Sequence, residues 1–294
     1  MEAVVADIFT AMRGHGYAFE IILVNDASQD NVWHKIEALA AQQDNIIGVC
    51  LAKNFGENAA LMAGYAQVSG DIVISLDDDG QNPPSEAFTL LNKLNEGYDV
   101  VFSAYAKKQH GIFRNIGSRI NDFMAEILIG KPRNIQVYSY NAARRYIIDE
   151  IVKYSGPYPY ITGLFFRTTR NVANVVVEHR KRAHGKSGYS FGKLVGLWLN
   201  GFTAFSVKPL RLASLLGLLF SALGVFYMVF LLWERLHNPQ MVMGYTSLMA
   251  VIIFVGGALM AMLGLIGEYI GRIYISINNA PQYVVKAISR QTNQ

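Results

Sequence analysis

The chain has 294 residues, of which 52% are hydrophobic and only 16% are charged. Charged residues make up about a quarter of an ordinary soluble domain, so this composition excludes a wholly soluble enzyme and indicates membrane segments. The net charge is a modest +4, and we expect no nucleic-acid partner. The single cysteine, Cys50, lies in a predicted buried strand and excludes a disulfide framework.

Strands and helices alternate in the first part of the chain. Continuous β-branched runs, separated by helices of about 10–15 residues, predict an α/β domain with a doubly wound, mostly parallel sheet. The predicted strands cover residues 20–24, 46–51, 71–76 and 98–103, and the predicted helices cover 4–14, 30–41, 57–68 and 85–95. The chain thus opens on a helix, whereas a doubly wound domain normally opens on a central strand, so we expect that a short N-terminal strand is missing from this sequence.

Further helices are predicted at 113–129 and 144–153. Between 191 and 205, large apolar residues recur at helical spacing with polar residues between them. Such a helix suits the membrane interface, and packing against the globular domain explains the pattern equally well.

Two long apolar segments stand near the C-terminus. No charged residue occurs from Leu212 to Trp233 or from Pro239 to Gly267, and each stretch exceeds the roughly 20 residues that a helix needs to cross hydrocarbon. We therefore predict two transmembrane helices at about 211–235 and 245–268. Positive charges flank the outer ends of both segments, which places both termini in the cytoplasm.

Three successive acidic residues, Asp77 to Asp79, directly follow the predicted strand at 71–76. Asp77 and Asp79, with Gln81, put oxygen ligands on alternating residues, and a Pro-Pro pair follows. Carboxylate and amide oxygens suit Mg²⁺ or Mn²⁺, which also bind phosphate oxygens. In a parallel sheet this position is the edge where ligands bind, and Asp26 lies at the same edge after the first strand.

Five segments stand out in order along most of the chain: Val24–Asp30, Asn54–Gly56 with Ala63–Gly64, Leu76–Pro84, Gly185–Tyr189 and Gly267–Tyr274. Together they resemble family-2 glycosyltransferases, in particular the polyprenyl-phosphate members of the bactoprenol and dolichyl-phosphate type. Two substitutions and the missing opening strand depart from the family pattern: Asn25 replaces an acid and Ala27 replaces a glycine, which leaves Asp26 as the acidic residue there.

The resemblance implies a nucleotide-sugar-binding fold of the glycosyltransferase A type and the transfer of one sugar from a nucleotide-diphosphate sugar to polyprenyl phosphate. It implies that the nucleotide sugar contacts Asp26, Lys53, Asp77 and Asp78, and that the metal contacts Asp77, Asp79 and Gln81. Asp79, Arg114 and Arg119 are the expected catalytic residues. The expected ligands of the acceptor phosphate are Arg182, Lys186, Ser187 and Tyr189.

A lipid phosphate is an anion near neutral pH, so it needs cations and a stabilised leaving group rather than a general base. Direct displacement at C1 implies inversion, and the relatives favour a UDP-sugar. We expect a catalytic domain at 1–178, a basic juxtamembrane segment at 179–210 and the two spans with a cytoplasmic tail at 211–294, in a bacterial plasma membrane. A processive polysaccharide synthase and a catalytically silent membrane scaffold remain as alternatives, and a homo-oligomer is left open.

Overall fold

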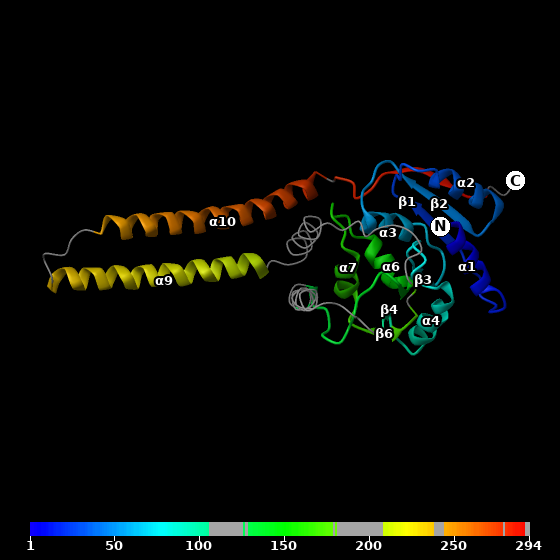
Figure 1. Ribbon diagram of the computed structural model, residues 1–294, viewed down its shortest axis with the longest axis horizontal. Coiled ribbons are helices and arrows are strands. Elements are labelled where there is room, and N and C mark those ends of the chain that lie inside the picture. The colour runs from blue at the N-terminus through cyan, green and yellow to red at the C-terminus, as the bar shows by residue number, and fades with distance from the viewer. Residues whose placement is uncertain are drawn as a thin grey trace. The chain divides into compact units, whose positions relative to one another are not determined.

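The computed structural model describes residues 1–105, 126, 129–178, 180, 208–237, 244–278 and 280–291 (Figure 1). The chain divides into two compact units. The first contains Met1–Gly196 together with the C-terminal tail Asn279–Gln294, and the second contains Leu197–Asn278. The tail therefore groups with the N-terminal unit, although the sequence-based division placed it beside the apolar helices.

The first unit contains a sheet of three strands in the order β1-β2-β7. β1 (Ile21–Asn25) pairs in parallel with β2 (Ile46–Leu51), and β7 (Val285–Ser289) pairs antiparallel with the other edge of β2. Val49 and Leu51 of β2 are almost completely buried, which explains the continuous apolar run in its sequence. The helices that follow the first two strands are α2 (Val32–Gln42) and α3 (Glu57–Tyr65), and α1 (Glu2–Met12) precedes them.

A second sheet has the strand order β3-β5-β4-β6. β5 (Asn141–Arg144) lies antiparallel between β3 (Ile72–Ser75) and β4 (Val100–Ala104), and β6 (Val172–Val176) runs parallel to β4. The described part of this unit also contains a 3₁₀ turn η1 (Pro84–Glu86) and helices α4 (Ala87–Asn95), α6 (Arg145–Val152) and α7 (Ile161–Thr168).

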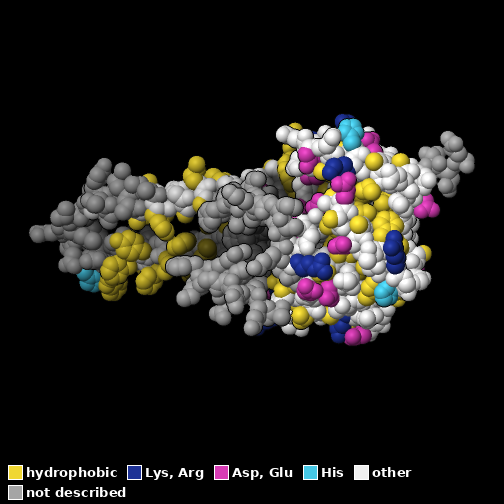
Figure 2. All heavy atoms as spheres, turned by 45° about the vertical axis from the view of Figure 1, so that its right-hand side comes forward, with side chains coloured by type: hydrophobic (Ala, Val, Ile, Leu, Met, Phe, Trp, Pro, Cys, Tyr) yellow, Lys and Arg dark blue, Asp and Glu magenta, His cyan; other side chains and the backbone are white. Residues whose placement is uncertain are grey.

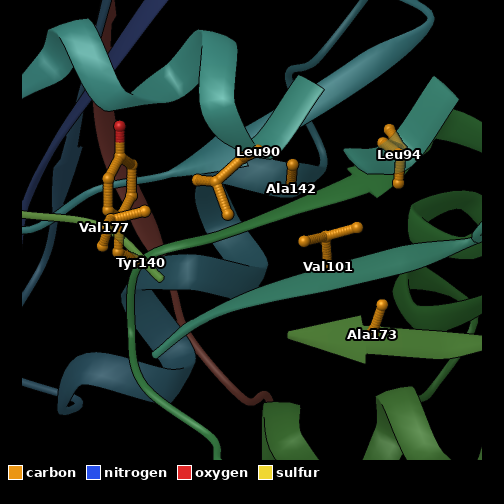
Figure 3. Close-up of a cluster of buried hydrophobic side chains, with 7 residues drawn as sticks. All are labelled: Leu90, Leu94, Val101, Tyr140, Ala142, Ala173 and Val177. Carbon is orange, nitrogen blue, oxygen red and sulfur yellow. The ribbon is translucent and has the colours of Figure 1, made fainter. Parts of the chain in front are cut away.

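The core of the second sheet lies against α4. Leu90 and Leu94 of this helix pack with Val101 of β4, with Ala142 of β5 and with the fully buried Tyr140 (Figure 3). Tyr140 also donates its hydroxyl to the carbonyl of Pro83, 3.2 Å away, which fixes the segment between β3 and η1. The core thus holds in place the residues that follow the acidic turn.

The α/β class is confirmed, but the expected mostly parallel single sheet is replaced by two mixed sheets. Among the described strands, three of the five pairings are antiparallel. Two elements cause the difference: β5 enters between β3 and β4, and β7 returns from the C-terminus to β2. Within the described residues, β1 and β3 each have a strand partner on one side only.

Helix α3 connects the two sheets. The hydroxyls of Tyr65 in α3 and Ser75 in β3 form a buried hydrogen bond of 2.7 Å. On the side of β1, a Cβ added at Gly64 would lie 3.1 Å from a methyl group of Val24, so the glycine permits close contact with that strand. The carboxyl ends of β1 and β3 are therefore both positioned by contacts to one helix.

The second unit is a pair of long helices, α9 (Lys208–His237) and α10 (Tyr245–Ile277). Their described large apolar side chains are mostly exposed, and hydrophobic atoms gather over them in Figure 2. Among the residues searched, Phe254–Ile277 is long and apolar enough to cross a membrane, whereas Ala213–Tyr227 in α9 is a shorter apolar stretch. One of the two predicted spans thus has its counterpart here. The predicted helix at 191–205 lies outside the described residues.

Candidate functional site

Asp26 follows β1 and holds the start of α3. Its carboxylate accepts hydrogen bonds from the backbone amides of Phe55, at 2.7 Å, and Gly56, at 2.8 Å. Gly56 is the N-cap of α3 and has a φ of 92°, a conformation that glycine adopts without steric cost. A carboxylate at this place satisfies amides that the helix itself leaves without partners, and it also complements the positive end of the helix dipole.

The neighbours of Asp26 have structural roles of their own. Asn25 is buried, and its side-chain oxygen accepts a hydrogen bond of 3.0 Å from the amide of Ser28. Ala27 has a φ of 53°, in the left-handed region, where a side chain costs energy. The Asn25–Ser28 turn thus presents Asp26 as its only acid.

Lys53 lies on the loop that Asp26 holds. Its ammonium nitrogen is 5.0 Å from the centre of the Phe55 ring, within the range of a cation–π contact. The side chain is exposed, so this contact is a weak one. The structure therefore brings Lys53, Phe55 and Asp26 together at the carboxyl end of β1, and the binding roles of Asp26 and Lys53 stay predictions.

The acidic turn follows β3. Ser139, in the segment before β5, donates a hydrogen bond to the carboxylate of Asp77, and the amide of Gln81 donates one of 3.0 Å to the carboxylate of Asp79. The second bond closes a local turn around Gly80, whose φ is 73°. Asp77 and Asp79 are half-buried, whereas Asp78 is exposed.

Tyr105 lies beside this turn, and sequence reasoning missed it. Its hydroxyl donates a hydrogen bond of 2.7 Å to the side chain of Asn82, and its ring centre is 4.4 Å from that of Tyr138. Burial raises the pKa of the Tyr105 hydroxyl, and the negative charges of Asp77 and Asp79 act in the same direction. The only signal in the sequence was the position of Tyr105 two residues after the strand predicted at 98–103.

Arg180 contacts the acidic turn as well. Its backbone amide donates to the carbonyl of Gln81 at 2.8 Å, and the side-chain amide of Gln81 donates to the carbonyl of Arg180 at 3.5 Å. Arg180 opens the basic segment that the sequence assigned to the acceptor. The hydrogen bonds between Arg180 and Gln81 thus attach the start of the basic segment to the acidic turn.

The side-chain oxygens of the acidic turn suit a metal ion whose other ligands are water and substrate phosphates. In the described part of the chain, no group of three or more His, Cys, Asp and Glu side chains forms a ready-made metal cage. Two carboxylates and one amide suit Mg²⁺, which is usually held by one or two carboxylates together with water and substrate phosphates. Asp77, Asp79 and Gln81 are thus compatible with a metal that arrives with a diphosphate.

Several predicted site residues lie outside the described residues. These are the catalytic candidates Arg114 and Arg119 and the acceptor candidates Arg182, Lys186, Ser187 and Tyr189. Their roles stay predictions.

Comparison with known proteins identifies the two parts of the chain. Residues 2–152 match the family model "Glycosyl transferase family 2", and residues 208–273 match "GtrB C-terminal hairpin". Over 275 residues, the chain is 37% identical to undecaprenyl-phosphate 4-deoxy-4-formamido-L-arabinose transferase of Yersinia pestis bv. Antiqua (strain Angola), covering 92% of this chain and 84% of that protein. The same identity and coverage are found for the protein of the same name from Yersinia pseudotuberculosis serotype O:3 (strain YPIII).

Solved structures resemble the chain more distantly. Glucosyl-3-phosphoglycerate synthase from Mycobacterium tuberculosis in complex with uridine diphosphate matches with a TM-score of 0.47 and 20% identity, over 69% of this chain and 73% of that chain. The same synthase with Mn²⁺, UDP-glucose and phosphoglyceric acid matches with a TM-score of 0.42 and 21% identity, over 62% and 67%. The sequence matches are far closer, and by them the chain belongs to glycosyl transferase family 2 and carries the GtrB type of C-terminal hairpin.

Proposed function

We propose that the protein transfers one sugar from a nucleotide-diphosphate sugar, with uridine as the nucleoside, to undecaprenyl phosphate, and that it inverts the anomeric centre. The observation that carries this proposal is the joint occurrence of a family-2 domain and the GtrB hairpin in a chain that is 37% identical, over 92% of its length, to undecaprenyl-phosphate sugar transferases. A family-2 domain alone would be compatible with many acceptors, whereas the hairpin favours an acceptor that resides in the membrane.

In this proposal the carboxyl ends of β1 and β3 form the donor site. Asp26 and Lys53 contact the nucleoside, and Asp77 and Asp78 contact the rest of the nucleotide sugar. Asp77, Asp79 and Gln81 hold Mg²⁺ or Mn²⁺, which when bound neutralises the charge that develops on the diphosphate leaving group. The hydrogen bonds from Ser139 to Asp77 and from Gln81 to Asp79 support this role, because they fix the orientation of both carboxylates before any ligand arrives.

The acceptor phosphate needs positive charge rather than a base, since its own oxygen is the nucleophile. We assign Arg182, Lys186, Ser187 and Tyr189 to its binding, and Arg114 and Arg119 to the stabilisation of the transferring group. Arginine suits this task because its guanidinium donates two parallel hydrogen bonds to a phosphate. The contact between Arg180 and Gln81 supports the assignment, because it attaches the start of the basic segment to the acidic turn.

The hairpin anchors the enzyme in a bacterial plasma membrane. We propose that α9 and α10 both cross the bilayer and that both termini face the cytoplasm, where nucleotide sugars are made. The apolar segment Phe254–Ile277 and the cationic residues that flank the hairpin in sequence support this topology.

The decisive experiment supplies both substrates. Membranes that contain the protein are incubated with Mg²⁺, undecaprenyl phosphate and a panel of labelled nucleotide sugars, and label is measured in the organic phase. We expect one member of the panel to give a single lipid-linked sugar that mild acid releases, and we expect no product without undecaprenyl phosphate.

Two outcomes would contradict the proposal. Long labelled polymers would favour the processive synthase. No lipid-linked product with any donor, from protein that is folded and present in the membrane, would favour the scaffold.

A further inference from the structure

The C-terminal tail returns to the edge of the candidate donor site. α10 ends at Ile277, and the tail then pairs with β2 from Val285, opposite Leu51, to Ser289, opposite Gly48. The pairing extends beyond the strands, because the carbonyl of Val284 accepts a hydrogen bond of 2.8 Å from the amide of Ala52. The next residue of the chain after Ala52 is Lys53, which begins the loop that Asp26 holds.

Tyr283, like Val285, is a tail residue that packs on a buried cluster which the loop residue Phe55 also contacts. It lies against the buried cluster of Val49, Leu51 and Ala63, and Phe55 packs on the same cluster. Burial raises the pKa of the Tyr283 hydroxyl, as expected for a phenol partly removed from water. Phe55 thus rests with its side chain on a cluster completed by the tail, while its amide is bound by Asp26 at 2.7 Å.

Gln282 fixes the tail just before Tyr283. Its side-chain amide donates a hydrogen bond to the carbonyl of Tyr154, which follows α6. The tail is therefore attached on both sides of Tyr283: to the segment after α6 through Gln282, and to the end of β2 through Val284. Two such attachments limit the freedom of the aromatic side chain between them.

We propose that the C-terminal tail is a positioning element of the donor site, with Tyr283 as its main residue. It acts through the loop Lys53–Gly56: the tail supports Phe55 through the shared buried cluster, and this keeps the amides of Phe55 and Gly56 aligned on the carboxylate of Asp26. Tyr283 does not contact the substrate. The proposal rests on the proposed function in one respect, namely that the end of β1 binds the nucleotide.

A purely structural tail would behave differently. If β7 only covered the edge of β2, weakening it would loosen β1 and β2 together and would lower the amount of active enzyme. A positioning tail instead changes the loop and the affinity for the donor, and leaves the turnover of bound substrates and the affinity for the lipid unchanged.

The first test needs no substrate. Hydrogen exchange is followed in the full-length protein in lipid nanodiscs, comparing wild type with Tyr283→Ala, Tyr283→Phe and Ile288→Ala. Ile288 is the control because it lies in the same tail, within β7, with its side chain exposed. In Tyr283→Ala, we expect the backbone amides of Phe55 and Gly56 to exchange about five- to tenfold faster. This change corresponds to the loss of about as much local stabilisation as one hydrogen bond provides. Exchange at the amide of Val49 should stay unchanged. Tyr283→Phe and Ile288→Ala should match wild type.

The second test uses turnover in the same nanodiscs. In Tyr283→Ala, the KM for the nucleotide sugar should rise about five- to tenfold, whereas kcat and the KM for undecaprenyl phosphate should stay within about twofold of wild type. Tyr283→Phe should restore the donor KM, because the ring and not the hydroxyl supports Phe55.

Three results would overturn the inference: unchanged exchange at Phe55 and Gly56 in folded Tyr283→Ala, faster exchange spread evenly over β1 and β2, or a loss confined to kcat. The exchange measurement requires no sugar donor, so its result can be judged separately from sugar transfer. If the protein transferred no sugar, the proposed function would be refuted, and the exchange rates at Phe55 and Gly56 would still test whether the tail positions the loop.

Discussion

Asp26 and Asp79 occupy equivalent places, each just beyond the carboxyl end of a strand, yet the structure uses them differently. The carboxylate of Asp26 bonds to amides 29 and 30 residues away along the chain and so joins β1 to α3. That of Asp79 bonds to an amide two residues away, within its own turn. An acid at this edge can therefore also hold distant parts of the fold together, as Asp26 does, or be held only within its own turn, as Asp79 is.

The largest effect is expected for Asp79→Asn. Loss of this carboxylate removes a predicted metal ligand, and sugar transfer should fall by roughly 10²–10³-fold, as when one stabilising group for a leaving anion is deleted. The thermal midpoint should change little, because the side-chain oxygen of asparagine can still accept the local hydrogen bond from the amide of Gln81. Initial rates and melting curves of the same preparation provide the test. Metal-dependent turnover near the wild-type rate would refute the assignment of Asp79.

Asp26→Asn should lower the stability of the fold, in addition to the loss of nucleoside binding that the proposed function implies. An amide group can accept from only one of the two backbone amides and directs its own N–H groups at the other, so the free energy of unfolding should fall by about 2–3 kcal/mol. Denaturant titration of detergent-solubilised protein measures this. Asp78→Asn is the matched control, because Asp78 is exposed, and it should leave stability unchanged. Equal stability of both variants would remove the distinction drawn between Asp26 and Asp79.

Tyr65→Phe tests whether α3 holds the two strand ends together. The hydroxyl of Ser75 would be left buried without its partner, which should cost about 1–2 kcal/mol. Burial raises the pKa of Tyr65 to about 12, in agreement with a hydroxyl that is sealed from water. In the double variant with Ser75→Ala, most of the loss should be recovered. A double variant less stable than Tyr65→Phe would show that Ser75 has another role.

Ala27→Gly should stabilise the protein by about 1 kcal/mol, because Ala27 adopts a left-handed conformation that costs an L-residue about 1–2 kcal/mol. Ala38→Gly in the middle of α2 is the control with the opposite sign, since glycine costs about 1 kcal/mol there. Differential scanning calorimetry on both variants gives the comparison. If Ala27→Gly also destabilised the protein, the turn after β1 would not be strained.

The smallest effect concerns Asp99, which precedes β4 at the opposite edge of its sheet. Burial acts to raise the pKa of this carboxyl, but hydrogen bonds from Thr169 and Tyr146 bring it below the ordinary value of 3.8. A lowered pKa stabilises the fold above pH 3.8, and this contribution disappears as the pH falls through the lowered value. Asp99→Asn should therefore be less stable than wild type at neutral pH, and the gap should close below pH 3.8. A constant gap in pH-dependent denaturation curves would contradict this.

The strands and helices of the N-terminal half were predictable because their patterns are local. The strand predicted at 46–51 coincides with β2, and those predicted at 20–24, 71–76 and 98–103 differ from β1, β3 and β4 by one or two residues at their ends. β5 could not be predicted from its sequence, Asn-Ala-Ala-Arg, which has no β-branched residue. It is a strand because β3 and β4 both pair with it, and such tertiary context overrides propensity.

The candidate site was predictable to the extent that its residues are sequential. Asp77, Asp79 and Gln81 were chosen from their spacing and Asp26 from its place after a strand, and their roles stay predictions. The support around them comes from distant segments: Ser139 contacts Asp77, Tyr105 lies beside the turn, and Tyr283 packs on the same buried cluster as Phe55 of the loop after β2. No local pattern indicates these neighbours, because each depends on which strands become adjacent.

The return of β7 has a practical consequence for anyone who wishes to detach the catalytic unit from the membrane. In topological terms the helical hairpin is an insertion into that unit, since the chain leaves it after Gly196 and re-enters it at Asn279. A fragment that simply stops before α9 would lack β7 and leave the apolar edge of β2 open to pairing with other molecules, which promotes aggregation. Replacement of 197–278 by a flexible linker would keep the edge covered, and it is therefore the better route to a soluble form.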